Sequence, residues 1–251
     1  MRWSWRLGTV FEIPIYLHWT FLLLLGFVAV SQLAASGSFV VAMSGVAFIA
    51  VVFGCVVLHE FGHALTARRF GIATRDVTLL PIGGIARLDR MPNDPRQELW
   101  VALAGPAVNL AIAGLLGIWL FLTGPGLIGS SFAAKLLLVN IALVVFNMLP
   151  AFPMDGGRVL RALLARRIGH MEATEVAARV GRGMAVVFGL IGLVWSPMLI
   201  LIALFVWFGA GQEAEMARSR AAFGGWASET GGPRGQRGVY RVGPWLIYRD
   251  E

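Results

Sequence analysis

The chain has 251 residues, of which 57% are hydrophobic and only 14% charged, and its mean hydropathy is +0.73. This composition excludes an ordinary soluble domain and indicates a membrane protein. The net charge of +7 does not indicate nucleic-acid binding, because 20 of the 21 basic residues fall on one side of the predicted membrane spans. Only Lys135 falls on the other side.

Six apolar windows predict the membrane spans. The fold class predicted from them is an all-α polytopic membrane protein with about six transmembrane helices and a small membrane-associated β-hairpin. Basic segments flank the windows on one face, so the positive-inside rule predicts a multi-pass protein of the cell membrane with both termini cytoplasmic. The last two windows are short and form a tight hairpin. In chain order the windows are residues 15–34, 40–64, 99–122, 132–149, 184–195 and 198–211.

The first window also permits a second interpretation. Arg2 and Arg6 precede an apolar run that ends near residues 33–36, which is the pattern of a cleavable signal peptide. Glu12 in the polar lead and His18 early in the apolar run argue against cleavage.

A zinc-hydrolase motif, HEFGH at residues 59–63, ends the second window. On a helix His59 and His63 share one face, about 5–6 Å apart at Cβ. Both can then bind one Zn²⁺ at about 2.0–2.1 Å and leave an open position for water. Glu60 lies beside that water as the candidate general base. Ionisable residues inside an apolar span are costly, so the motif indicates a function; an internally paired or snorkelling cluster is the alternative.

A zinc held by two histidines needs at least one more protein ligand, and Asp155 is the candidate. Pro150 and Pro153 end the fourth window, and the glycines at 156–157 permit unusual backbone angles. This break would aim a carboxylate at the metal from the end of a span. The alternative is a turn in which Asp155 only caps the next helix. Cys55, one turn before His59, is a conceivable ligand but fits a small packing residue better.

Three amides lie within the apolar windows: Asn109, Asn140 and Asn147. Each could donate a hydrogen bond to the oxyanion of the reaction, or join neighbouring helices. Asn147 is preferred as a catalytic residue because it lies nearest Asp155 in the chain.

Three motifs together carry a family resemblance. HEFGH at 59–63, AGPAVN at 104–109 and NMLPAFPMDGG at 147–157 resemble, in this order, the site-2 protease family of intramembrane zinc metalloproteases. The resemblance covers roughly residues 1–215. It implies His59, His63 and Asp155 as zinc ligands, Glu60 as the catalytic carboxylate and Asn147 as an oxyanion contact.

The resemblance is to a short form of that family. No hydrophilic insertion is long enough for a PDZ domain, and the 40 residues after Gly211 are too few for a pair of CBS repeats. Neither PDZ-gated substrate selection nor nucleotide sensing is therefore implied.

The implied function is regulated intramembrane proteolysis: hydrolysis of a peptide bond in or beside the transmembrane segment of a membrane-protein substrate. The expected partners are that substrate and the lipid bilayer, with no nucleic acid; a regulatory membrane partner and a homo-oligomer stay open. Two other classes also stay open. A divalent-metal transporter would predict internal repeats, which the sequence does not show. A catalytically silent scaffold with a structural zinc would not need Glu60.

The remaining segments predict a hairpin and a tail. β-prone runs at 76–80 and 85–88 flank Pro81-Ile82-Gly83-Gly84, and the free edge of such a hairpin could accept an unwound substrate strand. A plain connector is the alternative.

The Gly-rich residues 224–238 predict a flexible linker. Residues 239–248 are compatible with a strand or a surface anchor, although a disordered terminus is favoured. The predicted domains are a protease domain, 1–215, and a cytoplasmic tail, 216–251.

Overall fold

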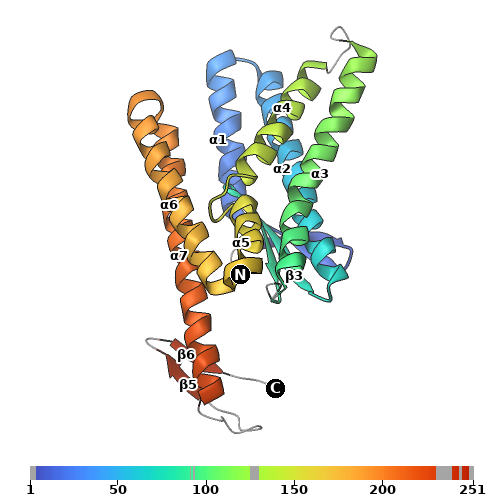
Figure 1. Ribbon diagram of the computed structural model, residues 1–251. Helices are drawn as coiled ribbons and strands as arrows, with labels where there is room; N and C mark the ends of the chain where they lie inside the picture. Colours follow the sequence, from blue (N-terminus) through green and yellow to red (C-terminus); the bar gives the residue numbers. More distant parts are fainter. Residues whose placement is uncertain are drawn as a thin grey trace.

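The computed structural model describes residues 4–90, 92, 94–124, 130–229, 239–242 and 245–248. Within them, helices form the bulk of the protein and a small sheet lies against one end of the α1–α4 helices (Figure 1). The elements in chain order are β1 (Ser4–Val10), β2 (Ile13–His18), α1 (Trp19–Ser36), α2 (Phe39–Arg69), β3 (Thr74–Leu80), β4 (Gly83–Leu88), α3 (Pro95–Thr123), α4 (Ser130–Asn147), α5 (Asp155–Ile168), α6 (His170–Trp195), α7 (Pro197–Glu229), β5 (Val239–Val242) and β6 (Trp245–Tyr248).

Five of the described helices are long and apolar enough to cross a membrane: α1, α2, α3, α6 and the part of α7 over Pro197–Ser219. The fourth predicted window corresponds to α4, whose apolar stretch Ser131–Asn147 is shorter. The predicted fold class is confirmed. The last two spans are longer than predicted and cover His170–Trp195 in α6 and Pro197–Ser219 in α7.

The sheet has four strands in the order β1-β2-β3-β4, so the predicted hairpin, β3–β4, is only half of it. β2 pairs in parallel with β3, with Ile15 opposite Val77 and Leu17 opposite Leu79. The first helix therefore starts at Trp19 rather than near residue 15. The alternation of Ile13, Ile15 and Leu17 favours a strand, a signal that the overall hydropathy of this segment hides.

α2 and α3 cross at very short distance, and glycine makes this possible. A Cβ on Gly62 would lie 2.6 Å from the carbonyl oxygen of Ala104, which is far inside contact distance. Small residues at helix crossings in membrane proteins permit such close approach. The sheet packs on the neighbouring face of α2 through the buried side chains of Ile13, Phe61 and Val77. The second half of α2 is thus fixed from two sides.

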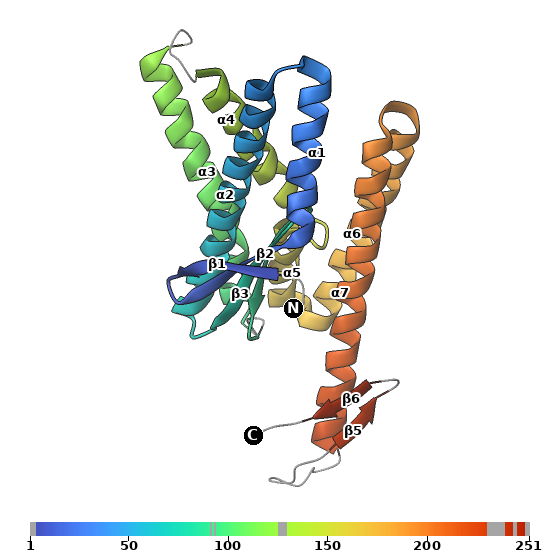
Figure 2. The same ribbon diagram turned by 180° about the vertical axis from the view of Figure 1, so that it is seen from behind.

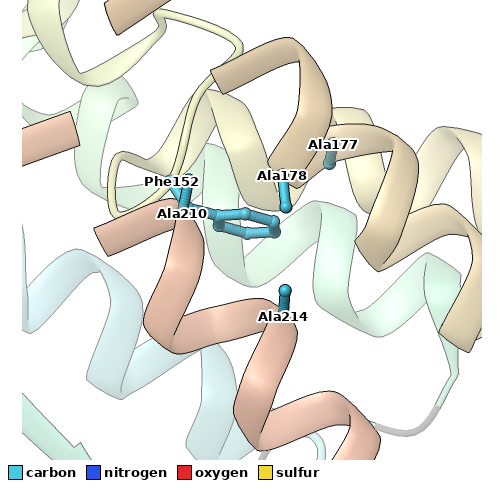
Figure 3. Close-up of a cluster of buried hydrophobic side chains, with 5 residues drawn as sticks. All are labelled: Phe152, Ala177, Ala178, Ala210 and Ala214. Atoms are coloured by element: carbon cyan, nitrogen blue, oxygen red, sulfur yellow. The ribbon is translucent and has the colours of Figure 1, made fainter. Parts of the chain in front are cut away.

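The α6–α7 hairpin lies beside α1–α4 rather than among them (Figures 1 and 2). The loop before α5 connects it to the rest of the protein. Phe152 of this loop is 1% exposed and packs among four small residues of α6 and α7 (Figure 3), namely Ala177, Ala178, Ala210 and Ala214. This packing joins the segment that carries Asp155 to the last two spans.

A buried ionic cluster strengthens the same junction. Arg161 of α5 donates from Nε to Glu98 Oε1 of α3 at 2.7 Å and from Nη1 to Glu213 Oε1 of α7 at 2.5 Å. Its guanidinium carbon lies 4.9 Å from the centre of the Phe152 ring. One side chain, 3% exposed, therefore binds α3, α5 and α7 together.

The predicted tail differs from the structure. α7 includes Gly224 and Gly225, so the prediction that a linker starts there is wrong. The Ala-, Glu- and Arg-rich residues 213–222 are strong helix formers and extend the helix. Residues 239–242 and 245–248 pair as an antiparallel hairpin rather than remaining disordered. The rest of the predicted linker, 230–238, lies outside the described residues, and the division at residue 215 stays a prediction.

Arg161→Ala should destabilise the protein by roughly 3–5 kcal/mol, because it removes the guanidinium that pairs with the buried carboxylate of Glu98 and the half-buried carboxylate of Glu213. Thermal unfolding of the purified protein in detergent measures this loss. Arg218→Ala is the matched control: it removes the exposed Arg218–Glu175 pair and should cost less than about 1 kcal/mol. Equal losses in the two variants would contradict the structural role of the buried cluster.

Candidate metal centre

Three side chains from two helices converge in the buried interior. His59 Nε2 and His63 Nε2 of α2 lie 3.1 Å apart, and Asp155 Oδ2 at the start of α5 lies 3.1 Å and 3.2 Å from them. All three residues are 6–7% exposed. The structure therefore brings together the three predicted ligands, which are separated by up to 96 positions in the chain.

The outer nitrogens of both imidazoles face acceptors, and this fixes where their protons lie. His63 Nδ1 lies 2.7 Å from the carbonyl oxygen of Val101, which can only accept a hydrogen bond. His59 Nδ1 lies 2.7 Å from Asn109 Oδ1. In each neutral imidazole the proton is then on Nδ1, and Nε2 presents a bare lone pair toward Asp155.

A relay of amides determines the orientation of Asn109. Its Nδ2 donates to Asn140 Oδ1 at 3.0 Å, so its oxygen is turned to His59. Asn140 in turn donates from Nδ2 to the Leu136 carbonyl at 2.9 Å, and this oxygen can only accept. Both asparagines are 0% exposed. A backbone carbonyl on α4 thus sets the tautomer of a histidine on α2 through two side chains.

Three acceptor atoms facing one another without a proton between them repel, and a bound cation relieves that repulsion. Two ligands on a tetrahedral zinc at about 2.0–2.1 Å lie about 3.3 Å apart, close to the observed 3.1–3.2 Å. Two imidazole nitrogens and one carboxylate oxygen are also a common donor set for catalytic zinc. The residues present fit the ion.

The loop before α5 is folded so tightly that only glycine fits after Asp155. A Cβ on Gly156 would lie 2.3 Å from the Leu149 carbonyl oxygen, and one on Gly157 would lie 2.7 Å from the carbonyl carbon of Ala151. Met154 is the residue that precedes α5, so the alternative role of Asp155 as a helix cap is wrong. Its carboxylate points to the histidines instead.

Glu60 lies beside this centre without joining the ligand group. Its Oε2 accepts a hydrogen bond from the backbone N–H of Ala86 at 3.1 Å, so β4 positions the carboxylate. A Cβ on Gly84 would lie 2.7 Å from Glu60 Cγ, which shows how closely the strand approaches. Sequence reasoning placed Glu60 next to the metal but did not connect it with the strand.

The other predicted candidates lie differently. Asn147 donates from Nδ2 to the Leu143 carbonyl of its own helix at 3.0 Å, and no described contact joins it to the ligands. Its oxyanion role stays a prediction. Cys55 is buried, and its sulfur accepts from Asn140 Nδ2 at 3.6 Å, which agrees with the packing interpretation.

A family model, "Peptidase family M50", matches residues 47–134 and 127–188, which contain every residue of the centre. The chain belongs to this family. A zinc metalloprotease of Methanocaldococcus jannaschii is 38% identical over 89% of this chain and 64% of its own length. Stage IV sporulation protein FB of Bacillus subtilis is 26% identical over 61% of this chain and 51% of its own length. The chain thus spans less than two thirds of these curated relatives.

A solved structure supports the same assignment. The site-2 protease from Methanocaldococcus jannaschii is 38% identical and superimposes with a TM-score of 0.63, covering 84% of this chain and 95% of that one. The M50 fold described here is therefore the site-2 protease fold.

Gly105→Ala should weaken metal binding without unfolding the protein. The new Cβ would lie 2.3 Å from His63 Nε2 and 2.6 Å from His59 Nε2, so both ligands would have to move. We expect zinc affinity to fall by about tenfold or more, measured by competition with a chelator. The matched control is Gly117→Ala on the same helix, where a Cβ meets open space. Unchanged zinc affinity in Gly105→Ala would contradict the proposed position of the ion.

Proposed function

We propose that this M50 chain is an intramembrane zinc metalloprotease that hydrolyses a peptide bond in or beside the transmembrane segment of a membrane-protein substrate. The observation that carries the proposal is the convergence of two bare imidazole nitrogens and one carboxylate inside the bundle, with a second carboxylate next to them. The names of the related zinc metalloprotease and site-2 protease support it.

His59, His63 and Asp155 would hold the zinc. A zinc ion bound there supplies Lewis acidity to the scissile carbonyl and lowers the pKa of the attacking water. Glu60 accepts the proton of that water and passes it to the leaving amine, so that a C–O bond forms as the C–N bond breaks. The hydrogen bond from Ala86 holds one oxygen of Glu60 and leaves the other for the proton.

Glu60 distinguishes proteolysis from metal transport or a structural zinc. Glu60→Gln should keep wild-type zinc content, because Glu60 is no ligand, and should lower cleavage by about 100-fold or more. The measurement compares zinc content and membrane proteomes of cells with wild type and variant, seeking fragments that disappear. Asp155→Ala is the comparison variant and should lose both zinc and cleavage. Full proteolysis in Glu60→Gln would refute this mechanism.

The outer edge of β4 is the proposed substrate-binding strand. Ala86 directs its N–H to Glu60 rather than to β3. In an antiparallel pair the N–H and the carbonyl of one residue point to the same side, so the carbonyl of Ala86 also points away from β3. A locally unwound substrate segment could pair with this edge and reach the metal, as in β-strand addition. The same alternation turns the N–H of Ile85 toward β3.

Ala86→Pro removes the N–H that positions Glu60 and should lower the cleavage rate by about tenfold, with zinc content unchanged. Ile85→Pro breaks the β3–β4 ladder instead and should lower both cleavage and folded yield. Cleavage of a reconstituted substrate, measured alongside zinc content, separates the two effects. If both variants cleave at the wild-type rate, this edge does not hold the substrate.

The protein is a multi-pass membrane protein, and the proposed orientation places both termini in the cytoplasm. This follows from the distribution of arginine along the chain. A single cysteine at the exposed residue 90 should react only with a reagent on the cytoplasmic side, and so should one at the exposed residue 166, next to the buried residue 165. A cysteine at Gly129, which lies outside the described residues, should react from the other side. External labelling at residue 90 would reverse the orientation.

A further inference from the structure

An apolar groove runs along α2 on the side away from the metal. It has a volume of about 620 Å³, and only apolar residues line it, from β1, β2, β3, α1, α2 and α3. On a helix of 3.6 residues per turn, its α2 residues Gly54, Leu58 and Leu65 lie about 120–160° from the direction midway between His59 and His63. The lining contains no proposed zinc ligand and not Glu60, so the groove is distinct from the site described above.

The length of the groove suits a single hydrocarbon chain. Its lining extends from Ala50 to Leu65, about 22 Å along α2 at 1.5 Å per residue. One leaflet of a bilayer with its headgroups is also about 20–22 Å thick. The groove therefore has the length of one leaflet.

Charge at one end of the groove fits a phosphate. Arg69 is exposed, lies one turn beyond Leu65 on the same face of α2, and makes no ion pair with any described residue. Arg68 donates from Nη1 to the Phe11 carbonyl at 3.1 Å and from Nη2 to Glu12 at 2.7 Å. It thus secures the β1–β2 turn whose Phe11 side chain lines the groove. The cationic end coincides with the C-terminal end of α2, a helix long and apolar enough to span a membrane, and lipid headgroups lie at the ends of such spans.

Apolar side chains around the groove remain uncovered by the protein. Leu7 and Phe11 of the β1 region are 60% and 61% exposed, and Leu58 of α2 is 50% exposed. Within a bilayer these surfaces contact hydrocarbon. We propose that the groove is a binding site for one phospholipid, with an acyl chain against α2 and the phosphate at Arg69.

The test uses full-length protein in phosphatidylcholine vesicles that contain a small fraction of phosphatidylglycerol with a photoreactive acyl chain. After irradiation, mass spectrometry locates the labelled residues, which we expect among those lining the groove. Gly54→Leu and Ala50→Phe fill the groove, because a Cβ at Gly54 meets open space and Ala50 is exposed. Each should lower labelling by about tenfold, since several methylene groups lose their contact.

The matched control is Gly114→Leu on the exposed face of α3, where a Cβ also meets open space; it should label like wild type. Arg69→Gln should lower labelling by about fivefold, and Arg69→Lys should restore it. All variants should bind zinc normally, which shows that they are folded. The proposal would be overturned if the groove is labelled equally in the wild type and in both filling variants. It would also be overturned if the groove cross-links to a helix of another protein in place of lipid.

Discussion

The alignment of three lone pairs on one point is the constraint on which the rest of the structure depends. His59, His63 and Asp155 present acceptors at 3.1–3.2 Å, an arrangement that is unfavourable without a cation. The imidazoles cannot simply rotate or change tautomer, because carbonyl oxygens and a relay of two buried asparagines hold their outer nitrogens. Burial makes every such contact stronger and every missing one more costly. Pre-organisation for the metal is thus built into α2, α3 and α4.

Glycines at close backbone contacts allow a carboxylate and two histidines from different helices to meet. At Gly62 and Gly105 the backbone of α3 approaches α2 until the ligands nearly touch it. At Gly156 and Gly157 the chain turns back on its own carbonyls and directs Asp155 inward. Phe152 and Arg161 then connect this loop to α6 and α7. The last two spans therefore support the segment that carries Asp155, although none of the three proposed ligands lies on them.

The sequence predicted those parts of the site that depend on local spacing. The histidines and Glu60 follow from helical periodicity, and the broken segment around Asp155 follows from its prolines and glycines. Asn147 was preferred because it lies nearest Asp155 in the chain; its amide donates to its own helix, and its oxyanion role stays a prediction. The contact of Asn109 with His59 could not be predicted, because it depends on where α3 crosses α2. β2 was missed because an apolar strand that runs directly into a helix shares the helix's hydropathy, and β1, which pairs with β2, was not predicted either. The parallel pairing of β2 with β3 is non-local and has no sequence signal.

X-ray absorption at the zinc edge, on the purified protein in detergent or bilayer, identifies the atoms that bind the metal. We expect one zinc per chain with two imidazole nitrogens and two oxygens, one from a carboxylate, at about 2.0–2.1 Å. The first coordination sphere should contain no sulfur. A sulfur ligand at about 2.3 Å, which would bring Cys55 into the site, or a protein that is folded but holds no zinc would contradict this expectation.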